Sequence, residues 1–131
     1  MQSQKILIAD DSQPYLDMIR DVLRDIGYQN VTCHTGAGAF EHIRDAQPDL
    51  AMIDLNFINA GEGWRLLDML RIHPATRLIP IIICSTDPTL PIAKATMLES
   101  LHCSFLEKPF DYEMLIDAIT VAIGPPTKHT P

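Results

Sequence analysis

The sequence predicts a doubly wound α/β fold, in which helices cover both faces of a parallel sheet. Short apolar runs alternate with longer amphipathic segments along the chain, as expected for successive βαβ units. The 131 residues fit one domain of ordinary size. Apolar residues make up 47% of the chain and charged residues 21%, a globular composition that needs no cross-links.

Five short apolar runs are predicted to form the strands. They span Lys5–Asp10, Val31–His34, Asp49–Asp54, Pro80–Ser85 and Phe105–Lys108. An amphipathic run follows each of these strands and predicts a helix there. Right-handed crossovers are the default between parallel strands.

The first predicted helix has apolar residues at three- and four-residue spacing, Leu16, Ile19, Leu23 and Ile26. Ser12 is its predicted cap and Gly27 its predicted end. Further helices are expected at about 36–45, around Trp64 to Leu70, and at 90–101. A last helix should follow a cap at Asp111, with an apolar face of Met114, Leu115, Ala118, Ile119 and Ala122. Residues 1–124 are interpreted as the domain, and the Pro-rich residues 125–131 as a tail or linker stub.

Charge and cysteine content narrow the function classes. Ten basic and seventeen acidic residues give a net charge of −7, which argues against direct nucleic-acid binding. The three cysteines, Cys33, Cys84 and Cys103, form no CxxC pair and favour a reducing compartment. There is no signal-peptide core and no apolar run long enough for a membrane span, so we expect a cytoplasmic protein without a membrane partner.

Polar residues follow the predicted strands at their carboxyl ends, where open parallel sheets bind ligands. These residues are Asp10, Asp11, Asp54, Ser85, Thr86 and Lys108. Each alone has an ordinary explanation, such as a helix start, a turn or an exposed loop lysine. Together they predict a site, because chance would have to place every one of them on the same edge of the sheet.

Three neighbouring carboxylates resist joint ionisation unless a cation compensates their charge. All-oxygen ligands in this number suit Mg²⁺ or Mn²⁺. With a divalent ion and Lys108 nearby, an ionised oxygen of Asp54 is a plausible in-line nucleophile toward phosphorus. The cluster therefore predicts an aspartyl phosphate.

The motifs ILIADDS, AMIDLN, IIICST and FLEKPF occur in this order. On these motifs the chain resembles, from Lys5 to Ile123, the receiver domain of two-component response regulators, the CheY-like superfamily. The resemblance implies a flavodoxin-like, five-stranded parallel sheet of order 2-1-3-4-5. It also implies a signalling switch, not an enzyme acting on other substrates, that catalyses its own phosphorylation and dephosphorylation.

The resemblance also implies roles for individual residues. Asp54 would be the phosphoacceptor, and Asp10, Asp11, Asp54 and the Asn56 carbonyl would hold Mg²⁺. Ser85 would turn toward the phosphoryl group, with Thr86 beside it, and Lys108 would be the ion-pair partner. Phe105 matches the switch aromatic, which would rotate inward, and Lys108–Pro109 matches a peptide bond that is often cis.

The implied phosphodonor is a sensor histidine kinase or a histidine phosphotransfer protein. The implied output is changed binding to a downstream protein or a fused effector domain, and the surface is compatible with a monomer that pairs only when phosphorylated. The chain departs from the family at LNFINAGEG after Asp54 and at LHCS before Phe105. Because the loop after Asp54 is altered, a second function stays possible, that of an interaction scaffold that acts without phosphorylation. A phosphatase with an aspartyl-phosphate intermediate is a weaker alternative, because Asn56 stands where that class needs a second Asp.

Overall fold

The structure is a computed structural model, and it describes residues 4–10, 12–28, 30–34, 38–54, 60–86 and 103–126. For residues 30–34 and 60–64 only the backbone is described. The helix predicted at 90–101, the loop after Asp54, and the predicted site residues Asp11 and Asn56 lie outside these ranges.

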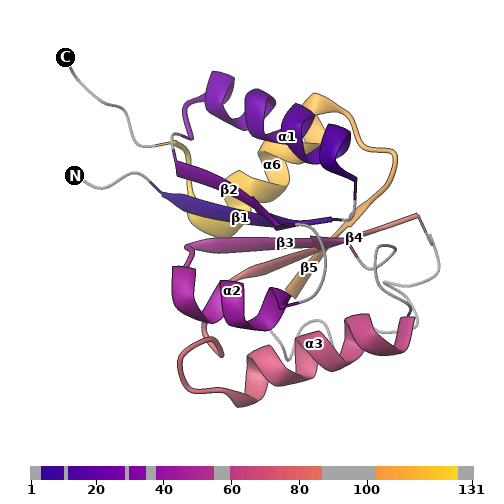
Figure 1. The fold of residues 1–131 in the computed structure, drawn as a ribbon. Helices are drawn as coiled ribbons and strands as arrows, with labels where there is room; N and C mark the ends of the chain where they lie inside the picture. The colour runs from indigo at the N-terminus through magenta and orange to yellow at the C-terminus, as the bar shows by residue number, and fades with distance from the viewer. Residues whose placement is uncertain are drawn as a thin grey trace.

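The strands form one five-stranded parallel sheet of order β2-β1-β3-β4-β5. They are β1 (Lys5–Ala9), β2 (Asn30–His34), β3 (Leu50–Asp54), β4 (Ile81–Ser85) and β5 (Cys103–Glu107). The carboxyl ends of β1, β3 and β4 point to the right in Figure 1. The predicted fold class and strand order are therefore confirmed.

Helices cover both faces of the sheet (Figure 1). They are α1 (Gln13–Ile26), α2 (Ala39–Ala46), α3 (Ala60–Ile72) and α6 (Tyr112–Ile123). The first and last lie on one face, and α2 and α3 lie on the other. Within the described part of the chain, none of the helices is both long and apolar enough to span a bilayer.

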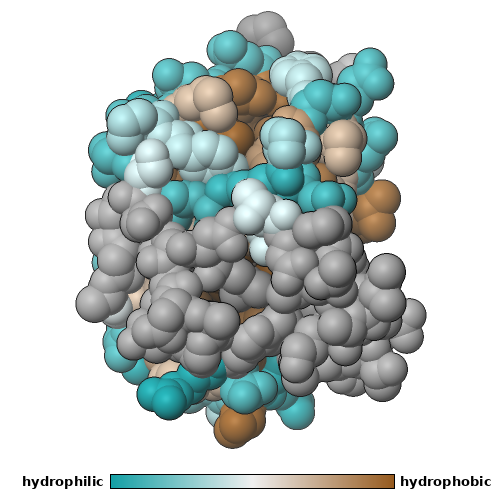
Figure 2. All heavy atoms as spheres, turned by 90° about the vertical axis from the view of Figure 1, so that its right-hand side faces the viewer, coloured by the Kyte–Doolittle hydropathy of each residue, from teal (hydrophilic) through white to brown (hydrophobic). Residues whose placement is uncertain are grey.

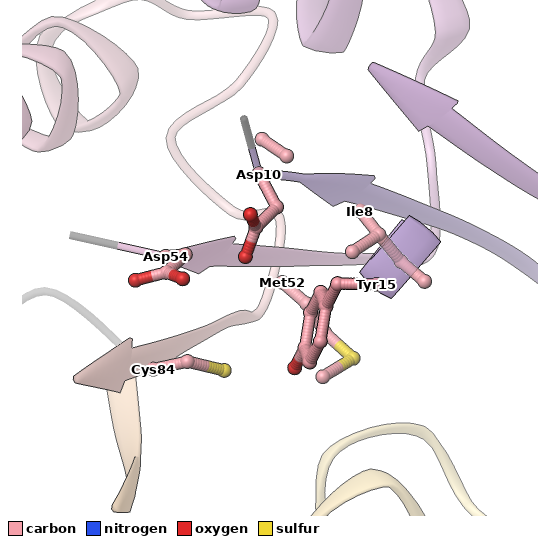
Figure 3. Close-up of a pocket in the computed structure, with 7 residues that line it drawn as sticks. Ile8, Asp10, Tyr15, Met52, Asp54 and Cys84 are labelled. Atoms are coloured by element: carbon pink, nitrogen blue, oxygen red, sulfur yellow. The ribbon is translucent and has the colours of Figure 1, made fainter. Parts of the chain in front are cut away.

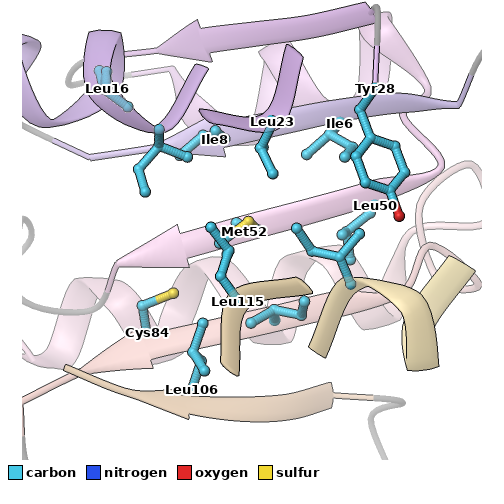
Figure 4. Close-up of a cluster of buried hydrophobic side chains, with 13 residues drawn as sticks. Ile6, Ile8, Leu16, Leu23, Tyr28, Leu50, Met52, Cys84, Leu106 and Leu115 are labelled. Carbon is cyan, nitrogen blue, oxygen red and sulfur yellow. The ribbon is translucent and has the colours of Figure 1, made fainter. Parts of the chain in front are cut away.

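Alternation of side chains along the strands divides the core into two layers, because neighbouring residues point to opposite faces of a sheet. Under α1 and α6 the sheet contributes Ile6, Ile8, Leu50, Met52, Ile82, Cys84 and Leu106 (Figure 4). Under α2 and α3 it contributes Leu7, Ala9, Ala51, Ile53, Ile81 and Ile83. Strands that are apolar on both faces read as continuous runs, which is the pattern expected of a doubly covered parallel sheet.

This alternation determines where the strand ends place their polar residues. Asp54 follows Met52 by two residues and so continues the row that faces α1. Asp10 continues the row of Ile8 in the same way, one residue beyond the end of β1. The two aspartates therefore end neighbouring strands on the same side of the sheet.

The predicted helix ends are found at α1 and α6. Oγ of Ser12 accepts a hydrogen bond from the Tyr15 N–H at 3.3 Å, and Gly27 ends α1 with a φ of 125°. Asp111 accepts from the Met114 N–H at 2.8 Å and caps α6. Both caps satisfy backbone donors that the first turn of a helix leaves unpaired.

Several predicted details differ from the structure, and three of them concern the helices and the last strand. The helix expected from about residue 36 begins at Ala39, after Gly38 with a φ of 89°, a left-handed conformation that glycine adopts at little cost. The fifth strand begins at Cys103 and ends at Glu107, so Lys108 follows the strand. Met114 is 44% exposed and lies outside the core, because Leu115 and Ile119 already fill the buried side of α6.

The end of α6 lies beside the start of β1. The Tyr28 hydroxyl donates to the carbonyl of Gly124 at 3.0 Å, and the Gln4 side chain donates to the carbonyl of Pro125 at 2.6 Å. Residues 127–131 lie outside the described ranges. The division into a domain of residues 1–124 and a tail of residues 125–131 stays a prediction.

Candidate functional site

Two carboxylates, those of Asp10 and Asp54, meet at the carboxyl edge of the sheet (Figure 3). Asp10 follows β1 and is 2% exposed, and Asp54 ends β3 and is 6% exposed. The strands β1 and β3 are direct neighbours, with Ala9 opposite Ile53. Burial of two acidic groups this close is unfavourable unless positive charge or hydrogen-bond donors compensate it.

Lys108 supplies the positive charge. Its Nζ is 3.3 Å from Oδ2 of Asp10 and forms a short contact with Oδ2 of Asp54. The lysine side chain is 18% exposed. Its backbone N–H donates to the Ser85 carbonyl at 2.8 Å, which extends the pairing of β4 with β5 by one residue. The Lys108–Pro109 peptide bond is cis, as the resemblance implies.

The surroundings favour the charged forms of Asp10 and Lys108. Burial alone would raise the pKa of Asp10, but hydrogen bonds with Asp54 and the Ser12 N–H, together with the charge of Lys108, hold that pKa below its usual value. Burial alone would lower the pKa of Lys108, but the two carboxylates raise it above its usual value. Lys108 therefore stays a cation at neutral pH.

Tyr15 and Cys84 complete the walls around the carboxylates (Figure 3). Together with Ile8, Ala9, Asp10, Met52 and Asp54 they line a pocket of about 10 Å³, which has room for about one water molecule. Burial, with the nearby charge of Asp54, raises the pKa of Cys84 to about 12, so its thiol is neutral.

The sequence alone assigned Tyr15 no role in the site. An aromatic residue in the first turn of the helix that follows the aspartates was the available signal.

Of five other predicted site residues, three are described and two lie outside the described residues. Ser85 is 2% exposed at the end of β4, and Thr86 after it is exposed. Phe105 is partly buried and packs against the apolar cluster under α2 and α3, on the face opposite α1. Of the predicted metal ligands, Asp11 and Asn56 are not among the described residues.

The donor chemistry of the described site fits Mg²⁺. Within the described ranges, no cluster of three or more His, Cys, Asp or Glu side chains forms a complete ligand set. Asp10 and Asp54 provide two buried carboxylates, and one or two carboxylates with several retained waters is how proteins commonly bind this ion. No His or Cys ligand set that would favour zinc accompanies them there.

Figure 2 shows the face of the molecule at the carboxyl ends of β1, β3 and β4. Hydrophilic surface crosses the upper part of this view, and apolar surface lies above it on the side of α1 and α6. An open hollow of about 420 Å³ is lined by Tyr15, Met18, Thr86, Lys108, Pro109 and Phe110. Lys108 thus lies between the carboxylates and an accessible depression.

Comparison with known proteins gives one consistent family. The family model described as "Response regulator receiver domain" matches residues 6–120. The DNA-binding response regulator MtrA of Mycobacterium tuberculosis is 29% identical over 113 residues, covering 86% of this chain and 47% of MtrA. The nitrogen assimilation regulatory protein NtrX of Azorhizobium caulinodans is also 29% identical over 113 residues, covering 85% of this chain and 24% of NtrX.

A solved structure supports the same fold. The chemotaxis response regulator CheY4 of Vibrio cholerae superposes with a TM-score of 0.78 at 24% identity, covering 92% of this chain and 99% of CheY4. The chain spans about half of MtrA and a quarter of NtrX, whereas it matches CheY4 over nearly its full length.

Proposed function

The chain belongs to the response regulator receiver domain family, and we propose that it is a switch in which Asp54 accepts a phosphoryl group. The observation that carries the proposal is the contact of one ammonium, that of Lys108, with the buried carboxylates of Asp10 and Asp54. A receiver domain is a signalling module of two-component response regulators. The phosphodonor that fits is a phosphohistidine on a sensor kinase or a phosphotransfer protein.

In the proposed step, a carboxylate oxygen of Asp54 forms a bond to phosphorus while the phosphorus–nitrogen bond of the donor breaks. The imidazole nitrogen keeps the electron pair of that bond and takes a proton from solvent. Lys108 stabilises negative charge on the transferring group, because its ammonium already contacts an oxygen of Asp54. Both residues sit in a largely water-excluded site, where such a charge interaction is stronger than in water.

Asp10, Asp11, Asp54 and the Asn56 carbonyl are the residues that would hold Mg²⁺. When bound, the ion would neutralise charge on the phosphoryl oxygens. Asp10 is already ionised in its surroundings, which suits a metal ligand. The burial of Asp10 and Asp54 supports the proposal, since burying two neighbouring acidic side chains is costly even with one lysine beside them.

The phosphoryl group adds charge and acceptor oxygens at the edge of the sheet, and we propose that Ser85, Thr86 and Lys108 respond to it. Phe105 on β5 would then change its packing against the cluster under α2 and α3. The output would be altered binding of a downstream protein or of an effector domain, or pairing of two phosphorylated copies. The names of MtrA and NtrX make a DNA-binding or regulatory effector a reasonable expectation for relatives that are longer than this chain.

The test is to incubate the chain with Mg²⁺ and acetyl phosphate and to measure its intact mass. We expect one phosphoryl adduct, which the variant Asp54→Asn should lose. Asp68→Asn, on the exposed side of α3, is the matched control and should keep the adduct. No adduct on the wild type would favour the scaffold that acts without phosphorylation. Rapid turnover of small phosphate esters would favour a phosphatase.

A further inference from the structure

Asp10, Ser12, Tyr15 and Lys108 form a closed ring of contacts at the start of α1. The Ser12 N–H donates to Oδ1 of Asp10 at 2.9 Å, and the Tyr15 N–H donates to Oγ of Ser12 at 3.3 Å. Nζ of Lys108 lies 4.3 Å from the centroid of the Tyr15 ring and 3.3 Å from Oδ2 of Asp10. Tyr15 therefore closes the ring by contacting the lysine that holds both carboxylates.

Tyr15 also lines two spaces. One is the pocket of about 10 Å³ next to Asp10 and Asp54, and the other is the open hollow of about 420 Å³. A smaller side chain at this position would enlarge both spaces and bring water closer to the lysine and the carboxylates.

The ammonium of Lys108 needs a neighbouring group that holds it in place. A lysine ammonium is a compact, strongly hydrated charge on a flexible stem, and here it is mostly removed from water. The face of an aromatic ring carries negative charge density and attracts a cation within about 6 Å of its centroid. The attraction is stronger where water is excluded, as it is beside the pocket.

We propose that Tyr15 is a positioning residue whose ring face holds the Lys108 ammonium against Asp10 and Asp54. The contact itself does not depend on phosphorylation. Its consequence for phosphoryl transfer rests on the proposed function, because a lysine released into the hollow would no longer sit beside the attacking oxygen of Asp54. The ring face carries this role and the hydroxyl does not, so phenylalanine should replace tyrosine.

The first test observes Lys108 directly by NMR, with its side-chain signals assigned from a Lys108→Arg variant. In the wild type, the ring current of Tyr15 should move the signals of the Lys108 Cε methylene upfield. Tyr15→Phe should keep this displacement, and Tyr15→Leu, which keeps an apolar side chain but no ring, should lose it. Tyr112→Leu is the matched control, since Tyr112 is 56% exposed at the start of α6. An undisplaced wild-type signal, or equal signals in Tyr15→Leu and the wild type, would overturn the proposal.

The second test measures the rate at which Asp54 is phosphorylated by acetyl phosphate with Mg²⁺. The strength of a cation–ring contact corresponds to a loss of about 2- to 30-fold in Tyr15→Leu. Tyr15→Phe and Tyr112→Leu should retain the wild-type rate. A Tyr15→Phe variant as slow as Tyr15→Leu would overturn the assignment to the ring face. If the wild type takes no phosphoryl group, the proposed function fails, and the NMR signals of Lys108 still decide whether Tyr15 holds the lysine.

Discussion

Lys108 and Asp10 are 98 residues apart in the chain, yet their side chains meet at 3.3 Å across the carboxyl edge of the sheet. Asp10 follows β1 and Lys108 follows β5, and two strands, β3 and β4, lie between them. The contact therefore joins the middle of the sheet to its edge strand. It also brings positive charge to both buried acidic side chains, because the same ammonium contacts Asp54.

Replacing Lys108 with methionine should destabilise the fold at neutral pH. The variant keeps the apolar stem and removes the charge, which leaves two buried carboxylates facing each other. We expect a loss of about 1 to 3 kcal/mol in the free energy of unfolding at pH 7, measured by urea denaturation.

The loss of unfolding free energy in the Lys108→Met variant should become smaller as the pH falls toward 5. Without the lysine the pKa values of the carboxyl groups rise in the folded state, so protonation in that range stabilises the folded variant relative to the wild type. Equal stability of the two proteins at pH 7, or a loss that grows at lower pH, would contradict the assigned ion pair.

Replacing Asp10 with asparagine should weaken Mg²⁺ binding on the order of tenfold or more, because it removes a charged oxygen from the proposed ligand set. Isothermal titration calorimetry measures the affinity. Asp68→Asn, which removes an equal charge from the exposed side of α3, should bind as the wild type does. If the two variants bind Mg²⁺ equally well, Asp10 is not a ligand. The same titration on Asp11→Asn tests the proposed ligand that lies outside the described residues.

Sequence periodicity was sufficient to predict the sheet, because β1, β3 and β4 are apolar on both faces and so appear as continuous apolar runs. It also predicted that Asp10, Asp54 and Lys108 converge, since parallel strands bring their carboxyl ends to one edge. Met114 was assigned to the core because helical spacing alone cannot tell which residues at the border of an apolar face are covered. Tyr15 was missed for a related reason, since its role depends on a lysine 93 residues later that the fold brings over its ring.

The cap of α6 offers a test of local stability. Replacing Asp111 with alanine removes the acceptor for the Met114 N–H and should cost about 1 kcal/mol of unfolding free energy. Asp111→Asn keeps an acceptor oxygen and should remain close to the wild type. Urea denaturation of the three proteins measures the difference. An asparagine variant as unstable as the alanine variant would show that the charge of Asp111 matters more than its hydrogen bond.

The contact between the residue that follows α1 and the end of α6 should depend on the hydroxyl of Tyr28. Tyr28 is fully buried and donates to the Gly124 carbonyl. Tyr28→Phe should lower the free energy of unfolding by about 0.5 to 1.5 kcal/mol, since the ring still fills its place and only the hydrogen bonds of the hydroxyl, to Gly124 and Thr120, are lost. Hydrogen exchange at the last turn of α6 should become faster. An unchanged exchange rate there would mean that the hydroxyl does not hold this end of the helix.

The buried thiol of Cys84 should make the fold less stable in alkaline solution. Burial raises its pKa from an ordinary value of 9.0 to about 12, so between these values the unfolded chain loses a proton that the folded chain keeps. Stability is therefore fully present below pH 9 and falls as the pH rises above it, by up to about 1.4 kcal/mol per pH unit from this group. Cys84→Ala removes this contribution and should show a shallower decline between pH 8 and pH 10.5 in urea denaturation, whatever its stability at neutral pH. Parallel declines of the two proteins would show that the Cys84 thiol ionises as readily in the folded chain as in the unfolded one.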